Sequence, residues 1–220
     1  MVRPQVIAVI CDLDGLLFDS ERRTRHAWQA AMRSLGHELD DVFYTTLIGR
    51  KIAISENMVA ERFSVDARIF RDAWRGEHHH LVASGPVAPR PGALELIAWL
   101  EQRQIPRAIA TSSIRADAER TLGSVITRFP VVVTGDQVTR GKPDPEIYLA
   151  AAAALGIAPD QCAALEDSEP GIAAAHAAGM RAMMVPDLKQ PSAQTLAIAH
   201  GIYPSLVEAR QEIERLMADV

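Results

Sequence analysis

Short apolar runs alternate with helix-like segments over most of this chain. The first run, 6–11, is uninterrupted and bounded by turn residues, which is typical of a strand buried on both faces. Later strands are predicted at 107–110, 131–134, 162–165 and 182–185. The helices that precede them are predicted at about 93–103, 115–122, 146–155 and 171–178. This alternation predicts a parallel sheet with helices on both faces.

A block without strand-like alternation separates the first strand from the others. Apolar residues recur there at helical spacing, and Ser20 is a candidate N-cap for a helix that ends near Gly36. The Pro- and Gly-rich segment 84–92 is typical of a linker. We therefore expect an α/β fold, a doubly wound, Rossmann-like parallel-sheet core (1–19 and 85–220) with an inserted α-helical cap (20–84). Beyond the last main strand, the sequence predicts a final strand or loop at 196–202 and an edge helix at 204–217.

Composition narrows the class of protein. A chain of 220 residues suits one α/β domain with a subdomain, and its net charge of −5 offers no basic surface for nucleic acid. Cys11 and Cys162 both fall in apolar runs, which favours buried free thiols and a reducing compartment. We find neither a secretory signal pattern nor an apolar run long enough to span a membrane. We expect a cytoplasmic monomer that binds neither nucleic acid nor membranes.

Two acidic residues directly follow the first strand, in the sequence Asp12-Leu-Asp14-Gly. Open α/β sheets bind ligands at the carboxyl ends of their parallel strands. Residues two apart in extended backbone point to the same side, so Asp12 and Asp14 can face one ligand. By itself, an Asp-x-Asp pair is also compatible with a solvated turn.

Polar residues follow three other predicted strands or lie near their ends. Thr111-Ser112 suits either a helix cap or phosphate binding. Lys142 lies in the rigid turn 141–145, where an isolated lysine is most often a solvated surface residue.

The last of these motifs is acidic. Glu166-Asp167-Ser168 is able to cap the helix that begins near Pro170. Alternatively, together with Asp12 it supplies a set of carboxylate oxygens of the kind that Mg²⁺ prefers.

Taken together and in this order, the four motifs resemble those of the haloacid dehalogenase superfamily. They are DLDGLLFDSE, ATSS, GKPDPEIY and LEDSEPGI. The resemblance extends from about residue 6 to 185 and is greatest to the subfamily of β-phosphoglucomutase and the small sugar-phosphate phosphatases. That subfamily carries a helical C1-type cap between the first two motifs, where this chain has its helical block.

The resemblance implies a role for each motif in phosphoryl transfer. Asp12 would be the nucleophile that forms an aspartyl-phosphate, and Asp14 the general acid and base. Thr111, backbone N–H groups at Ser112, and Lys142 would bind the transferring phosphoryl group.

The resemblance also implies Mg²⁺ as the cofactor. Its ligands would be the Asp12 carboxylate, the Asp14 backbone carbonyl and Asp167, with Glu166 in direct or supporting contact. Dehalogenases proper lack the second acid, so Asp14 favours phosphate esters over carbon–halogen bonds.

We therefore expect a Mg²⁺-dependent phosphatase that hydrolyses a small phosphorylated metabolite, such as a sugar or polyol phosphate. In this subfamily the cap selects the leaving group. Candidate cap residues facing the site, whose orientation the sequence does not give, are Arg22, Arg23, His26, Arg50 and Lys51.

Two other functions use similar residues. A β-phosphoglucomutase-like mutase would carry a histidine where this chain has Thr24 and an arginine where it has Ile52. A phosphoacceptor signalling module is much shorter, and its acidic pair and acceptor Asp lie on different strands. Both patterns depart from this sequence, and the order of the motifs also argues against a catalytically silent binding protein.

Overall fold

The computed structural model describes residues 4–48, 52–83, 85 and 87–218. The chain divides into two compact units. The core unit comprises Met1–Asp19 and Ala88–Val220, and the helical unit comprises Ser20–Val87. The second crossing between the units thus falls within the Pro- and Gly-rich segment 84–92.

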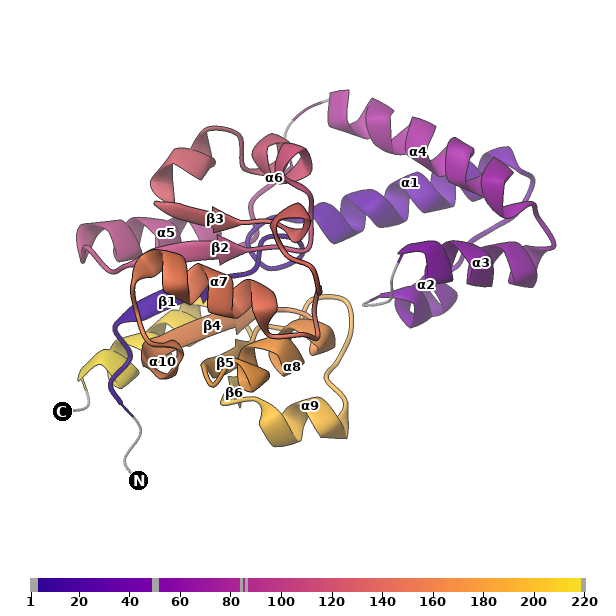
Figure 1. Ribbon diagram of the computed structural model, residues 1–220. Helices are drawn as coiled ribbons and strands as arrows, with labels where there is room; N and C mark the ends of the chain where they lie inside the picture. The colour runs from indigo at the N-terminus through magenta and orange to yellow at the C-terminus, as the bar shows by residue number, and fades with distance from the viewer. Residues whose placement is uncertain (1–3, 49–51, 84, 86, 219–220) are drawn as a thin grey trace. The chain divides into compact units, whose positions relative to one another are not determined.

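The described residues of the core unit form one parallel sheet of six strands (Figure 1). The strands are β1 (Ala8–Cys11), β2 (Arg107–Ala110), β3 (Val131–Val133), β4 (Cys162–Glu166), β5 (Arg181–Met184) and β6 (Gly201–Ile202). Their order across the sheet is β3-β2-β1-β4-β5-β6, so β1 lies between β2 and β4. This arrangement confirms the predicted α/β fold and brings the carboxyl ends of β1, β2 and β4 together.

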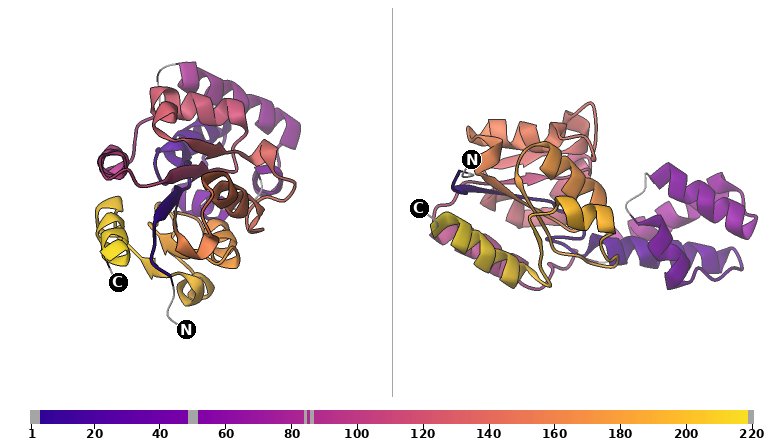
Figure 2. Two further views of the ribbon diagram at one scale, coloured as in Figure 1. Left: turned by 60° about the vertical axis from the view of Figure 1, so that its left-hand side comes forward. Right: turned by 90° about the horizontal axis from the view of Figure 1, so that it is seen from below.

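Helices cover both faces of the sheet (Figure 2). In the core unit they are α5 (Ala93–Gln102), α6 (Arg115–Leu122), α7 (Glu146–Leu155), α8 (Glu169–Ala177), α9 (Ala193–Ile198) and α10 (Leu206–Ala218). On one face α5 packs with α10, and on the other α7 packs with α8. The strands are therefore buried on both sides, which is why they read as continuous apolar runs.

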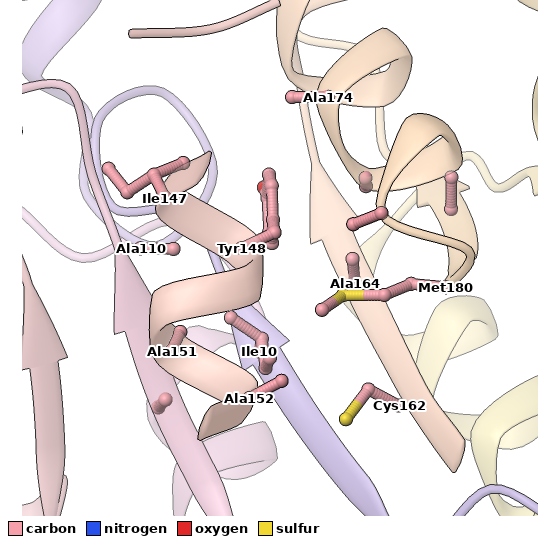
Figure 3. Close-up of a cluster of buried hydrophobic side chains, with 14 of the residues drawn as sticks. Ile10, Ala110, Ile147, Tyr148, Ala151, Ala152, Cys162, Ala164, Ala174 and Met180 are labelled. Carbon is pink, nitrogen blue, oxygen red and sulfur yellow. The ribbon is translucent and has the colours of Figure 1, made fainter. Parts of the chain in front are cut away.

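Small side chains let α7 approach the sheet closely (Figure 3). Ile10, Ala110 and Ala164 from three adjacent strands belong to the same buried cluster as Ile147 and Tyr148 of this helix, whose sequence is EIYLAAAAAL. Tyr148, on the first turn of α7, is completely buried in this cluster. The packing of α7 thus brings a phenolic hydroxyl to the strand ends.

Two element boundaries differ from the sequence-based expectation because polar caps decide them. The segment predicted as a final strand or loop, 196–202, begins with the last residues of α9, and within it only Gly201–Ile202 is a strand. Helix α9 starts ahead of this segment, where Ser192 Oγ accepts a hydrogen bond from Thr195 N (3.3 Å). Helix α8 begins before the predicted residue 171, since Ser168 Oγ accepts from Gly171 N (3.1 Å).

The helical unit has its own core. Its helices are α1 (Ser20–Ser34), α2 (Asp41–Leu47), α3 (Ile52–Phe63) and α4 (Ala67–Ala83), so the predicted helical block is confirmed for the described residues. Trp28 packs edge-on against Tyr44 and Phe70, with ring centroids 6.0 and 5.1 Å apart. No helix in the described ranges has the length and apolar character needed to cross a bilayer.

Candidate active site

The turn after β1 holds the two acids at the centre of the sheet. Asp12 N donates to Leu165 O (2.9 Å), which continues the pairing of β1 with β4 by one residue. Gly15 has a φ of +86° and donates to Phe18 O (2.8 Å). A Cβ at Gly15 would collide with the Asp167 carboxylate. Glycine is therefore needed here both for the backbone conformation and for the close approach of Asp167.

Lys142 lies beside Asp12, and its side chain is only 6% exposed. Its ammonium donates to Asp12 Oδ1, to Ala110 O (3.0 Å) and to Glu166 Oε1 (2.5 Å). Burial alone lowers the pKa of a lysine, but the two carboxylates outweigh it and raise the pKa of Lys142. Lys142 is thus a permanent buried cation, and all three of its N–H groups have acceptors.

Glu166 is completely buried and accepts hydrogen bonds at both oxygens. Besides Lys142, Oε1 accepts from Tyr148 Oη (2.7 Å), and Oε2 accepts from Ser168 N (3.2 Å) and Ser168 Oγ (2.9 Å). A carboxylate has about four acceptor positions, so those of Glu166 are filled. Gly171 makes room for this group, because a Cβ there would collide with it.

Asp14 has a different set of partners. Its Oδ2 accepts from Thr111 Oγ1 (3.0 Å) and from Ser113 Oγ (2.7 Å). Thr111 is completely buried, whereas Asp14 is partly exposed. Neither hydroxyl serves as the cap of α6, whose N-cap residue is Ile114 without a side-chain hydrogen bond.

Three carboxylates form a group suited to a divalent cation. One oxygen each from Asp12, Glu166 and Asp167 lies within 4.8 Å of the others. An all-oxygen, acidic donor set fits Mg²⁺. Because the acceptor positions of Glu166 are already filled, Asp12 and Asp167 are the carboxylates best placed to hold the ion.

The charge state of Asp12 depends on its neighbours. Burial raises the pKa of Asp12, and the nearby Glu166 and Asp14 charges add to the increase, whereas Lys142 lowers it. Positive charge beside Asp12 therefore favours the anionic form that a nucleophile needs.

The structure brings most of the predicted site residues together at the ends of β1, β2 and β4. These are Asp12, Asp14, Thr111, Lys142, Glu166 and Asp167. Ser112 differs in that its side chain is exposed. Its predicted contact with phosphate, through the backbone N–H, stays a prediction. Sequence reasoning missed Ser113 and Tyr148, although both belong to the motifs that it singled out.

The candidate cap residues lie in the helical unit where they are described. Arg22, Arg23 and His26 are on α1, and Arg23 Nη2 donates to Gly85 O (2.8 Å). Arg50 and Lys51 fall outside the described residues. Whether any of these five contacts a substrate stays a prediction.

Comparisons with known proteins place the chain in a family. A model of the haloacid dehalogenase-like hydrolases matches residues 7–179. Validoxylamine A 7'-phosphate phosphatase of Streptomyces hygroscopicus subsp. limoneus is 34% identical over 90% of this chain and 93% of its own length. Hexitol phosphatase A of Escherichia coli K12 is 33% identical over 79% of this chain and 80% of its own.

A similar solved structure is a haloacid dehalogenase family hydrolase from Deinococcus radiodurans with bound phosphate and sodium. Its TM-score is 0.82 at 28% identity, covering 96% of each chain. The family match extends over most of the chain, including every strand of the sheet from β1 to β4 and the residues gathered at their ends. The chain therefore belongs to the haloacid dehalogenase-like hydrolase family and is a phosphatase.

Proposed function

We propose that this protein is a Mg²⁺-dependent phosphatase that hydrolyses small phosphomonoesters through an aspartyl-phosphate at Asp12. The observation that carries the proposal is that two carboxylates, two residues apart, have different kinds of hydrogen-bond donor. Asp12 contacts a buried ammonium, and Asp14 contacts two neutral hydroxyls. Such a difference suits one carboxylate to nucleophilic attack and the other to carrying a proton.

The first step would transfer the phosphoryl group to the enzyme. A carboxylate oxygen of Asp12 forms a bond to phosphorus while the bond from phosphorus to the ester oxygen breaks. The departing alkoxide takes a proton from the Asp14 carboxylic acid and leaves as an alcohol. Lys142 offsets the negative charge that gathers between Asp12 and the phosphoryl group.

The second step would release phosphate and restore Asp12. Asp14, now a carboxylate, removes a proton from water as the water oxygen bonds to phosphorus. The bond from phosphorus to the Asp12 oxygen breaks, which gives inorganic phosphate and the free carboxylate. Asp14 ends protonated, ready for another ester.

Asp12, Asp167 and the backbone carbonyl of Asp14 would hold the Mg²⁺ ion. When bound, it supplies positive charge that shields the anionic ester from the anionic nucleophile. Glu166 would support the site by holding Lys142 in place, as its hydrogen bonds to that lysine and to Tyr148 and Ser168 suggest.

The substrate proposed is a sugar or polyol phosphate, because one of the named relatives is a hexitol phosphatase. The helical unit would act as the cap that selects the leaving alcohol. A mutase is not favoured. The hydroxyl of Thr24, at the position of the mutase histidine, donates to Ser20 O (3.1 Å) within α1.

A screen of phosphorylated metabolites tests this function. We expect release of inorganic phosphate with Mg²⁺ and its loss with a chelator, restored by added Mg²⁺. Asp12→Asn keeps the side-chain shape but removes the nucleophile, so release should fall by at least about 10³-fold. Isomerised sugar phosphate without free phosphate would contradict the hydrolase, and full activity of Asp12→Asn would contradict the nucleophile.

A further inference from the structure

Two hydroxyl groups converge on a single oxygen of Asp14. Ser113 Oγ lies 2.7 Å from Asp14 Oδ2, and Thr111 Oγ1 lies 3.0 Å from the same atom. The Ser113 bond is the shorter of the two. Thr111 belongs to the motif expected to bind phosphate, but neither the family resemblance nor the sequence pattern gives Ser113 a role.

The position of Ser113 is fixed by its backbone. Its N–H donates to Thr111 Oγ1 (3.1 Å), and its carbonyl accepts from Gly135 N (2.9 Å). Thr111 is itself tied to β3 by its N–H, which donates to Val133 O (3.0 Å). Gly135 allows the loops to meet, because a Cβ there would collide with the Ser112 carbonyl. The hydroxyl of Ser113 is therefore held at Asp14 by bonds on both sides of its Cα.

We propose that Ser113 is a positioning residue that fixes the orientation of the Asp14 carboxyl group for proton transfer. This inference rests on the proposed function. Thr111 has a single O–H, which the family resemblance assigns to the transferring phosphoryl group. When Thr111 donates to that group, Ser113 is the hydroxyl that still holds Asp14 Oδ2. With Oδ2 held by Ser113, Oδ1 is the oxygen left to give and take the proton in the two steps.

A purely structural role for Ser113 predicts different kinetics. Loss of packing or stability would slow every substrate alike. Loss of a correctly placed acid slows only those esters whose leaving group needs a proton, since a good leaving group departs as an anion. The comparison of two aryl esters thus separates the two roles, and kcat/KM reports the first step without interference from the second.

The experiment measures kcat/KM for phenyl phosphate and p-nitrophenyl phosphate with saturating Mg²⁺. Ser113→Ala should lower the phenyl phosphate value by about 10-fold and the p-nitrophenyl phosphate value by less than about 2-fold. Ser113→Thr, which retains the hydroxyl, should restore the wild-type ratio of the two. The exposed Ser124 provides the matched control, and Ser124→Ala should leave both values unchanged.

Equal losses on the two esters in Ser113→Ala, or an unchanged phenyl phosphate value, would overturn the positioning role. The same would follow if Ser113→Thr, folded by its thermal melting curve, failed to restore the ratio. Asp12→Asn is measured alongside. Its full activity would overturn the proposed function itself and so would be distinguishable from a failure of Ser113 alone.

Discussion

The two carboxylates that follow β1 have opposite surroundings. Asp12 lies on the side of Lys142, here called the lysine side, and Asp14 lies on the side of the Thr111 and Ser113 hydroxyls, the hydroxyl side. On the lysine side, Asp12 and Glu166 both form ion pairs with the buried ammonium of Lys142. On the hydroxyl side, Asp14 accepts hydrogen bonds from the neutral hydroxyls of Thr111 and Ser113 and is partly exposed. The Lys142 ammonium offsets part of the rise in the pKa of Asp12 that burial causes, whereas the two hydroxyls on Asp14 bring no charge. Two identical side chains on one turn thus acquire different chemistry from their surroundings.

The largest effect on this contrast is expected from removing the cation. Lys142→Met would leave Asp12 and Glu166 buried without their shared positive charge. We expect a stability loss of about 3–5 kcal/mol in the metal-free protein, measured by urea unfolding. Turnover with Mg²⁺ should fall by about 10²–10³-fold.

Lys189→Met provides the control for that change. Lys189 pairs with Glu169 (2.6 Å) but is 44% exposed, so its loss should cost no more than about 1 kcal/mol. Similar losses of stability in the two variants would contradict the claim that Lys142 compensates a buried acidic pair.

A smaller effect is expected one contact further from Asp12. Tyr148→Phe removes one of the four hydrogen bonds to Glu166 and leaves the ring in place. We expect a stability loss of about 1–3 kcal/mol, because the bond is to a charged group, and a few-fold decrease in kcat as Lys142 loses support. Steady-state kinetics together with thermal unfolding check both parts.

Tyr44→Phe is the matched change in the helical unit, where Tyr44 Oη donates to Glu21 Oε1 (2.8 Å). It should lower stability by a similar amount without affecting the kcat for p-nitrophenyl phosphate. If Tyr148→Phe likewise left kcat unchanged, Tyr148 would be a stabilising residue only.

The sequence was sufficient to predict which residues gather at the strand ends. Asp12 and Asp14 follow a run that only a buried strand explains, and Lys142 and Asp167 fall in motifs with a fixed order. Strand order in a parallel sheet then brings these motifs to one edge. The cap at Ser192 shows the limit, because the helix that it starts, α9, extends into the first residues of the segment predicted as a strand or loop.

The partners within the site were not predictable in the same way. That Glu166 has its acceptor positions filled depends on Tyr148, which only the packing of α7 against the sheet brings near. Ser113 looks like one more hydroxyl in a short polar run until its bond to Asp14 is seen. Tertiary contacts, which have no local sequence signal, assign these roles.

Trapping the covalent intermediate tests the central claim most directly. In Asp14→Asn, p-nitrophenyl phosphate needs no acid for the first step, but water lacks its base in the second. We predict a burst of about one equivalent of p-nitrophenol per enzyme, with phosphate on the peptide that contains Asp12. Continued turnover without a burst, or phosphate on a different residue, would contradict Asp12 as the nucleophile.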